Sequence, residues 1–388
     1  EKILDYRGRT PKKLGLSWSG TGYLALSALN VKNGYIDFKA DANYGDQELY
    51  DRWMGDNHLH KGQVVFTTEA PMGNVAQIPN DALYILSQRT IAFEVKRDSI
   101  REDFLATLLR SPKIFNELTS LSSGGTAKGV SQKSLSNLKV YLPTSLEEQS
   151  AIGSLFRTLD DLLASYKDNL ANYQSLKVTM LSKIFPKAGQ TVPEIRLNGF
   201  DGEWEEKELG DIVKFYSGLT YKPSDVLSCG TLVLRSSNVR DGELIYIDNV
   251  FVNPNIVNCQ NVKSGDIVVV VRNGSRDLIG KHALIRSEMP NTVIGAFMTG
   301  VRCDNPEFIN ALLDTKMFIS EIHRNLGSTI NQITTGNFKR MKFYFPLKDE
   351  QQAIGAYFSN LDNLINSYQE KISQLETLKK KLLQDMFI

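Results

Sequence analysis

The sequence predicts an α+β protein with two mainly-β modules and two long coiled-coil helices, arranged as an internal repeat. Three observations support this fold class. Two heptad-patterned segments lie 202 positions apart, each follows a region of short alternating apolar strands, and those two regions share sequence blocks. The chain has 388 residues, which is too long for one ordinary core.

The repeat is clearest in residues 147–185 and 349–387, which align without a gap and share 15 identities in 39 positions. Apolar residues recur in both at steps of three and four, which is typical of a coiled-coil helix. A helix of this length would be about 58 Å long. Two copies in one chain favour an intramolecular pair over a zipper between identical chains. The expected seam of the first helix is Ile152, Leu155, Leu159, Leu162, Tyr166, Leu170, Tyr173, Leu176, Met180 and Ile184.

The duplication extends into the regions before the helices. Residues 22–34 (GYLALSALNVKNG) match 230–242 (GTLVLRSSNVRDG), 61–66 (KGQVVF) match 264–269 (SGDIVV), and 124–143 match 327–346. Strands such as Val64–Phe66 and Ile267–Val271, bounded by Gly and Asn turns, make each module mostly β. One helix is expected over Glu102–Leu118 and its mate over Pro306–His323.

The predicted division is a first module at 1–144, a helix at 145–185, a linker at 186–207, a second module at 208–346 and a helix at 347–388. Residues 186–207 carry two prolines and three glycines, which end the first helix. Module one lacks an opening like that of module two, so roughly 20 residues are expected to precede Glu1.

Bulk composition narrows the class of protein. Hydrophobic content of 41% and charged content of 23% describe an ordinary globular protein, and the net charge of +1 neither demands nor forbids nucleic acid. The longest apolar run is too short for a membrane span. The three cysteines lie far apart, which excludes a disulfide framework and a CxxC metal site and favours a reducing cytoplasm. The HLH at 58–60 is too sparse for zinc, so no metal is expected.

Several motifs together resemble the specificity subunit of type I restriction–modification systems. They are the EQxAIG…LDxL start of each long helix, the duplication itself, and GFDGEWEEKELGDI at 199–212. The resemblance covers nearly all of the chain. It implies two target-recognition domains, separated by an antiparallel pair of helices and related by a pseudo-twofold axis. Half-sites about 34–36 Å apart on DNA need such a stiff spacer between the two domains.

The resemblance also implies the partners and cofactors. The chain itself would be non-catalytic and cytoplasmic, and would bind double-stranded DNA. It would bind two modification subunits, adenine-N6 methyltransferases that use S-adenosylmethionine, and in the full complex two restriction subunits that use ATP and Mg. The loops TTEAPMGN (67–74) and VRNGSRDLIG (271–280) differ between the modules, which predicts a bipartite, asymmetric target.

Basic and polar side chains on turn-rich segments are the candidates for phosphate and base-edge contacts. The basic segment at residues 5–13 suits a backbone clamp, or is a solvated loop. RNGSR (272–276) offers Arg for guanine and Asn for adenine, or is an ordinary β-turn, and Glu69 suits a cytosine amino group. The predicted DNA-binding residues are Arg7, Arg9, Lys12, Lys13, Thr67, Thr68, Glu69, Asn74, Arg89, Lys128, Lys133, Tyr221, Lys222, Arg240, Arg272, Asn273, Ser275, Arg276, Thr329, Asn331 and Gln332.

The helices are expected to dock the methyltransferases through the face opposite the seam, with Phe156, Asp160, Phe358 and Asp362. The alternative is that both phenylalanines widen the helix–helix core. Two alternative functions are a coiled-coil protein-interaction scaffold without DNA readout and a self-sufficient enzyme. An enzyme is disfavoured because NPEF (305–308) lacks the second proline of the adenine-methyltransferase loop and no GxxxxGK[ST] occurs.

Overall fold

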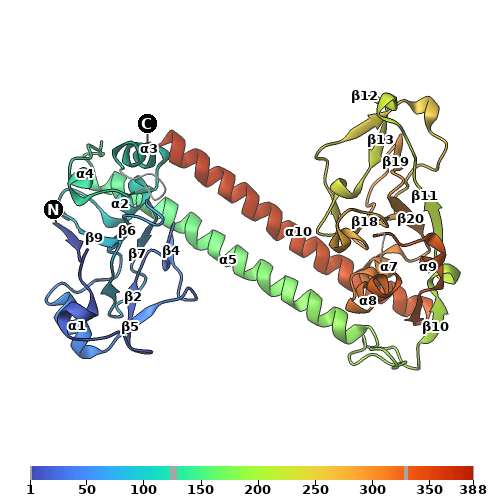
Figure 1. Cartoon of the computed structure of the whole chain (residues 1–388), viewed down its shortest axis with the longest axis horizontal. Helices are drawn as coiled ribbons and strands as arrows, with labels where there is room; N and C mark the ends of the chain where they lie inside the picture. The colour runs from blue at the N-terminus through green and yellow to red at the C-terminus, as the bar shows by residue number, and fades with distance from the viewer. Residues whose placement is uncertain (1, 123–128, 327–330, 388) are drawn as a thin grey trace. The chain divides into compact units, whose positions relative to one another are not determined.

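The chain folds into two compact units. A computed structural model describes residues 2–122, 129–326 and 331–387 (Figure 1). Unit 1 comprises residues 1–168 and 369–388, and unit 2 comprises residues 169–368. Each unit therefore contains one β-rich module and one end of each long helix.

Unit 1 is built around a four-stranded antiparallel sheet with the order β1-β9-β6-β7. A three-stranded sheet, β5-β2-β8, and the hairpin β3–β4 lie beside it. The strands are β1 (Lys2–Asp5), β2 (Tyr23–Leu26), β3 (Val31–Lys32), β4 (Tyr35–Ile36), β5 (Asn43–Gly45), β6 (Val64–Thr67), β7 (Val75–Gln77), β8 (Ile85–Leu86) and β9 (Thr90–Glu94). The shorter helices are α1 (Gln47–Met54), α2 (Glu102–Leu109), α3 (Pro112–Leu121) and α4 (Gln132–Ser136).

Unit 2 has the equivalent four-stranded sheet, β11-β20-β17-β18, and a second sheet, β12-β16-β13-β19. It also has the hairpin β14–β15 and a two-stranded antiparallel sheet of β10 and β21, which are far apart in the sequence. The first strands are β10 (Glu205–Glu208), β11 (Lys214–Ser217), β12 (Val226–Leu227), β13 (Thr231–Leu234), β14 (Val239–Arg240) and β15 (Glu243–Leu244). The later strands are β16 (Val250–Val252), β17 (Ile267–Val270), β18 (His282–Leu284), β19 (Thr292–Ile294), β20 (Met298–Arg302) and β21 (Lys342–Phe345). Its shorter helices are α6 (Leu209–Ile212), α7 (Pro306–Leu313), α8 (Lys316–Asn325) and α9 (Thr335–Arg340).

The shared strand order confirms the predicted internal repeat and the mainly-β character of both modules. The single helix expected over Glu102–Leu118, and its mate expected over Pro306–His323, are each two helices. Ser111 and Thr315 cap the second helix of each pair, because their hydroxyls accept the N–H groups of Ile114 (3.4 Å) and Phe318 (3.2 Å). Such caps begin a new helix rather than continue the previous one.

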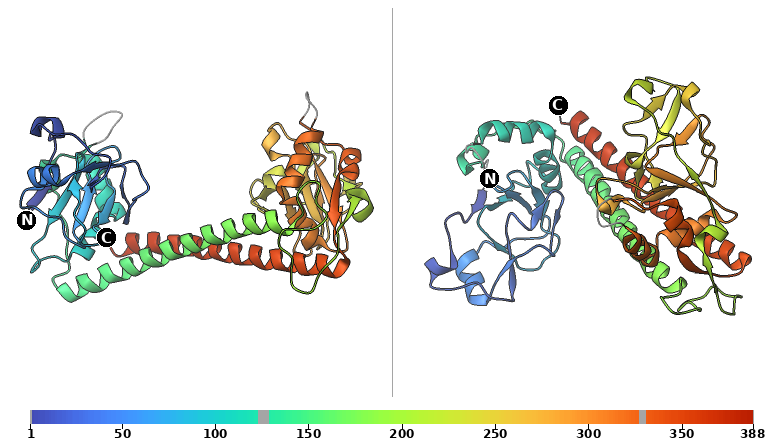
Figure 2. Two further views of the ribbon diagram at one scale, coloured as in Figure 1. Left: turned by 90° about the horizontal axis from the view of Figure 1, so that it is seen from below. Right: turned by 45° about the vertical axis from the view of Figure 1, so that its right-hand side comes forward.

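The two long helices, α5 (Leu146–Ile184) and α10 (Lys348–Asp385), have the predicted positions and lengths. They lie side by side in each unit (Figure 2). In unit 1 Lys167 binds Glu376 with an N–O distance of 2.6 Å. In unit 2 the ring centroids of Tyr173 and Tyr368 are 5.5 Å apart, and Lys177 binds Asp362. Residues later in α5 thus contact residues earlier in α10, so the pairing is antiparallel.

The seam of α5 differs from the predicted one by a single residue at some turns. Leu155 and Leu176 are each 41% exposed, whereas Phe156 and Leu163 are buried. The corrected seam keeps the spacing of three and four, and it places Lys177 where Leu176 was expected. In α10 the equivalent Lys379 occupies the matching position. A seam that tolerates lysine must supply it with an anionic partner.

Those partners are aspartates. In unit 2 the Lys177 Nζ atom lies 2.6 Å from Asp314 and 2.6 Å from Asp362. His282 faces the carbonyl oxygen of Gly280 with Nδ1 (3.0 Å) and the Asp314 carboxylate with Nε2 (3.3 Å). Burial alone would raise the pKa of Asp314, but His282 and Lys177 lower this pKa to about 2. Burial opposes the charged form of His282, but Asp314 outweighs it and raises the His282 pKa.

Unit 1 contains the counterpart of this cluster, in which Asp160 binds both Arg110 and Lys379. The prediction that Phe156, Asp160, Phe358 and Asp362 dock a partner therefore needs correction. Phe156 and Phe358 are 0% and 1% exposed and pack in the cores, so they present no docking surface. Asp160 and Asp362 are held in intramolecular ion pairs.

In the described part of the chain, no helix combines the length and apolar character needed to cross a bilayer.

Candidate nucleic-acid interface

Three chain segments meet at one end of the central strands of unit 1. The segment after β6 bonds to the segment before β9, because the Thr68 N–H donates to the Arg89 carbonyl at 2.8 Å. It also bonds to the segment before α4. The Val130 N–H donates to the Thr68 carbonyl at 3.0 Å, and Glu69 and Gly129 form an isolated antiparallel β-bridge. We call residues 67–74, 87–89 and 129–130 loop cluster 1.

Unit 2 repeats this arrangement with different side chains. The Val271 N–H donates to the Phe297 carbonyl at 2.9 Å, and the Ile333 N–H donates to the Val271 carbonyl at 2.9 Å. Arg272 and Gln332 form an isolated β-bridge through their backbones, as Glu69 and Gly129 do in unit 1. We call residues 270–276, 295–297 and 331–333 loop cluster 2.

The entry segment of each module, residues 5–13 in unit 1 and residues 215–225 in unit 2, lies against its loop cluster. In unit 1 the Gln88 side chain donates to the Arg9 carbonyl at 2.5 Å, which places the basic residues 7–13 next to the cluster. In unit 2 the Leu219 N–H donates to the Ile294 carbonyl (2.7 Å) and the Ala296 N–H to the Leu219 carbonyl (2.9 Å). The predicted residues of the entry segments and of the loops are thus brought together within each unit.

Several predicted DNA-binding residues have structural roles instead. Thr67 and Thr68 are 0% and 1% exposed, since successive strand residues here are buried on both faces. The Thr67 hydroxyl accepts the Asn74 N–H at 2.9 Å, and the Asn74 side chain donates to the Val31 carbonyl at 2.9 Å. Arg9 lies over the Tyr6 ring and donates to the Trp53 carbonyl. The side chains of Thr67, Asn74 and Arg9 thus hold the loops in place, and the buried Thr67 and Thr68 present no surface to DNA.

Other predicted residues are accessible. Lys12 and Lys13 are exposed on a 3-10 turn (Pro11–Leu14) whose N-cap is Thr10. The further exposed residues are Arg7, Arg89, Lys133, Lys222, Arg240, Arg272, Ser275 and Arg276. Lys128 and Thr329 lie outside the described residues.

The polar residues of loop cluster 2 mainly connect its segments. The Asn273 side chain donates to the Ser236 hydroxyl at 3.0 Å, and the Asn331 side chain donates to the Gly274 carbonyl at 3.0 Å. Gln332 is half-buried beside Arg272, and Tyr221 is half-buried at the entry segment. The loop is therefore held on two sides, which orients the exposed Arg272.

Two residues that were not predicted from the sequence, Phe297 and Arg235, also lie in this region of unit 2. Phe297 is 51% exposed and lies under Arg272, whose Cζ atom is 4.9 Å from the ring centroid. Arg235 lines the same hollow of about 750 Å³ as Phe297 and Tyr221, and its Nε atom is buried without a hydrogen-bond partner among the described residues. An aromatic residue next to a strand usually packs in the core. Phe297 could have been identified from the sequence only by aligning the two repeats, which places it opposite Arg89.

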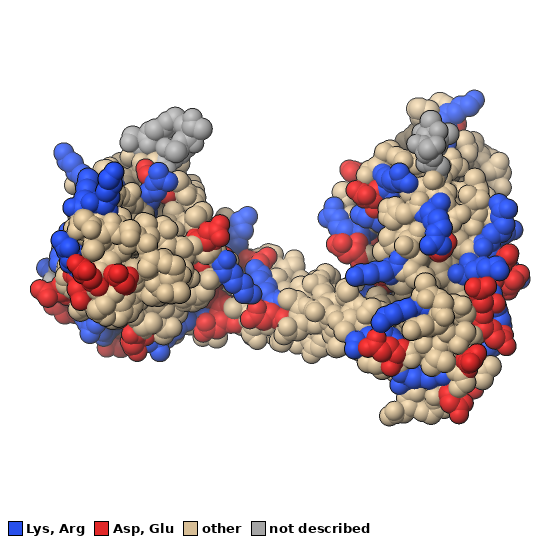
Figure 3. Space-filling model, turned by 60° about the horizontal axis from the view of Figure 1, so that its bottom comes forward, with Lys and Arg blue, Asp and Glu red and all other residues tan. Residues whose placement is uncertain are grey.

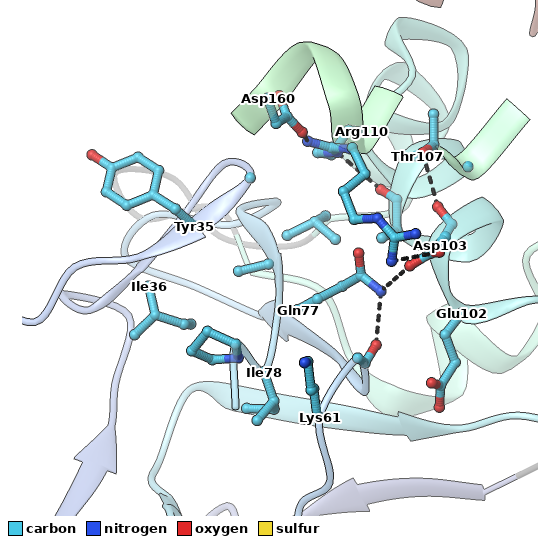
Figure 4. A pocket seen from close by; sticks show the side chains of 18 of the residues that line it. Tyr35, Ile36, Lys61, Gln77, Ile78, Glu102, Asp103, Thr107, Arg110 and Asp160 are labelled. Carbon is cyan, nitrogen blue, oxygen red and sulfur yellow. Dashed lines mark hydrogen bonds and ion pairs between the residues drawn. The ribbon is translucent and has the colours of Figure 1, made fainter. Parts of the chain in front are cut away.

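A second hollow, in unit 1, has a different character. It has a volume of about 670 Å³ and lies between the β3–β4 hairpin, β7, α2 and α5 (Figure 4). Gln77 donates to Asp103 at 2.8 Å, Arg157 binds Asp103 at 3.0 Å, and Arg110 binds Asp160. The charges of this cleft are largely paired with one another, so they hold α5 against the module.

Charged side chains are interspersed over the surface that Figure 3 shows, where Lys and Arg lie among Asp and Glu on both units. Contacts to DNA on this face would therefore depend on local groups of cations rather than on a continuous basic belt. Among residues 2–122, 129–326 and 331–387 no group of three or more His, Cys, Asp and Glu is arranged to hold a metal ion.

Comparison with known families decides the relationship. The model of the type I restriction modification DNA specificity domain matches residues 7–172 and 201–377, once for each repeat. The chain belongs to this family. Each match starts in or before an entry segment and continues into a long helix, so the family unit is the module together with its helix.

Relatives in the type I specificity family are similar over much of the chain. The MjaVIII specificity subunit of Methanocaldococcus jannaschii is 26% identical over 313 residues, covering 77% of this chain and 72% of that protein. The EcoKI specificity subunit of Escherichia coli is 24% identical over 191 residues, covering 47% and 41%. The crystal structure of the S subunit from M. genitalium superposes with a TM-score of 0.66 at 17% identity, covering 100% of this chain and 93% of that one. The last comparison confirms the fold.

Proposed function

We propose that this chain is the non-catalytic DNA-reading subunit of a type I restriction–modification complex, acting in the cytoplasm. The observation that carries the proposal is the pair of equivalent loop clusters, which share a backbone arrangement but differ in their exposed side chains. A shared backbone with unlike side chains suits two readers of different half-sites. The target would then be bipartite and asymmetric.

The partners follow from the same role. Double-stranded DNA would contact both loop clusters, with Lys12, Lys13 and Lys222 near phosphates. Two adenine-N6 methyltransferase subunits would supply the chemistry with S-adenosylmethionine, and two restriction subunits would use ATP and Mg. This chain would itself need no cofactor.

The test is to express the chain with its methyltransferase subunits in cells that lack other adenine methylation and to sequence the methylome. One bipartite motif with two different halves is the expected result. In a second measurement, DNA affinity of the purified complex should fall steeply with salt, because phosphate contacts release counterions. Affinity that does not change with salt, together with no motif, would instead favour a protein scaffold.

A further inference from the structure

Equivalent positions in the two loop clusters carry different pairs of side chains. Glu69 and Arg272 occupy equivalent positions. Each forms an isolated β-bridge, Glu69 to the segment before α4 and Arg272 to the segment before α9, and each directly follows the residue whose N–H donates to the facing loop. Arg89 and Phe297 correspond, because their carbonyls accept those bonds. The position thus holds Glu69 with Arg89 in unit 1 and Arg272 with Phe297 in unit 2.

One arginine is present in each pair, but it has moved from one segment to the other. In unit 1 it lies before β9, and Arg89 Nε is 2.6 Å from the Glu69 carboxylate. In unit 2 it lies after β17, and Arg272 is stacked on Phe297. The partner side chain holds the guanidinium in both cases, by an ion pair in one unit and by a cation–π contact in the other.

Both arginines are available to a ligand. The side chains of Arg89 and Glu69 are 56% and 44% exposed, and Phe297 is 51% exposed. Within the described part of the chain, no hydrogen bond or ion pair engages the guanidinium of Arg272. Arg89 has a φ of +65°, a left-handed conformation that non-glycine residues adopt at a cost and that recurs at functional sites.

The chemistry of the pairs matches one ligand. Guanidinium is a planar fork of donors, and guanine presents two acceptors, O6 and N7, at matching spacing in the major groove. A guanidinium that is already held loses less side-chain freedom on binding. Stacking on Phe297 leaves all five N–H donors of Arg272 available, and the contact of Arg89 with Glu69 is made by Nε rather than by a terminal nitrogen.

We propose that Arg89 and Arg272 each bind a guanine base edge, one in each half-site, and that Glu69 and Phe297 are the positioning residues that orient them. This inference rests on the proposed function, since it names the bases that the two loop clusters recognise. Each half-site therefore contains a guanine at its equivalent position, read from opposite segments of the cluster. Phe297 determines specificity without contacting the base edge itself.

The test uses the full chain co-expressed with its methyltransferase subunits and methylome sequencing. Arg272→Ala should reduce discrimination about 5- to 150-fold at one guanine of one half-site, the range for one bidentate contact. Phe297→Ala should reduce discrimination at the same guanine, whereas Phe297→Tyr should keep the wild-type discrimination there, because tyrosine keeps the ring. Arg89→Ala should relax one guanine in the other half-site. Ile319→Ala, on the exposed face of α8 (47% exposed), is the control and should leave the motif unchanged.

The outcomes separate the inference from the function on which it rests. Absence of any bipartite motif with the unaltered chain would overturn the proposed function. A normal wild-type motif that Phe297→Ala leaves intact, or an even loss of methylation at all sites, would overturn the inference alone, since phosphate contacts weaken binding uniformly. Unchanged unfolding temperatures would show that each variant is folded.

Discussion

Replacing Lys177 with methionine is expected to destabilise unit 2 strongly, because it leaves two carboxylates without their shared cation. The Lys177 side chain is 19% exposed, and Asp314 and Asp362 are 25% and 15% exposed. Removing one partner of a buried ion pair costs about 3–5 kcal/mol. Unit 2 spans residues 169–368, and for a domain of that size each kcal/mol lowers Tm by about 2–4 °C. The expected decrease in Tm is therefore roughly 6–20 °C.

The matched control is Lys167→Met. Its ion pair with Glu376 has the same N–O distance of 2.6 Å, but the two side chains are 55% and 53% exposed. Exposed pairs contribute about 0–1 kcal/mol, so this variant should unfold nearly as the wild type does.

Differential scanning calorimetry would give the unfolding temperatures of the two variants. Hydrogen exchange with mass spectrometry would assign each unfolding transition to unit 1 or unit 2. A double-mutant cycle with Asp362→Asn would isolate the Lys177–Asp362 coupling. Equal effects of Lys177→Met and Lys167→Met would refute the reasoning, because burial would then not decide the contribution of these pairs.

Three further predictions follow from other features. Gly153→Ala should destabilise unit 1 by about 1–3 kcal/mol, since its Cβ would lie 2.8 Å from backbone atoms at the start of α2, whereas Gly20→Ala, which meets nothing within 4 Å, should be neutral in urea unfolding. The raised pKa of His282 stabilises the folded state fully below pH about 6.5, and this contribution is lost as pH rises through the folded pKa, so His282→Gln should remove that part of the pH dependence of Tm. Lys12→Ala combined with Lys13→Ala should reduce the slope of log K against log salt by about 0.9 per lost phosphate contact, measured by fluorescence anisotropy on the target DNA.

The repeat and the long helices were predictable because they leave a pattern in the sequence. Heptad spacing and gapless identity identify α5 and α10 to within about three residues of their observed ends. The phase of the seam was not predictable. Leu176 is more apolar than Lys177, so local pattern favours the leucine, and only the distant Asp314 and Asp362 make the lysine acceptable in the seam.

The candidate site was predicted as segments more reliably than as residues. The divergent loops and the entry segments do come together in each unit. Burial, however, reassigns Thr67 and Thr68 to the core, because strand β6 is covered on both faces. Phe297 was not among the sequence candidates, because its contact with Arg272 depends on the pairing of β17 with β20, which no local pattern contains.

Sharing of the long helices between the units has a consequence for how such a protein acquires new specificity. The last turns of α10 complete unit 1, and the last turns of α5 complete unit 2. Deletion of a gene segment that encodes one module together with its own helix would therefore remove packing contacts from both units. An exchange whose crossover points lie just outside the helices, near residues 186 and 347, would replace one module and leave the paired helices untouched. Under the proposed function, recombination at those two points would alter one half of the bipartite target in a single event while the scaffold stays intact.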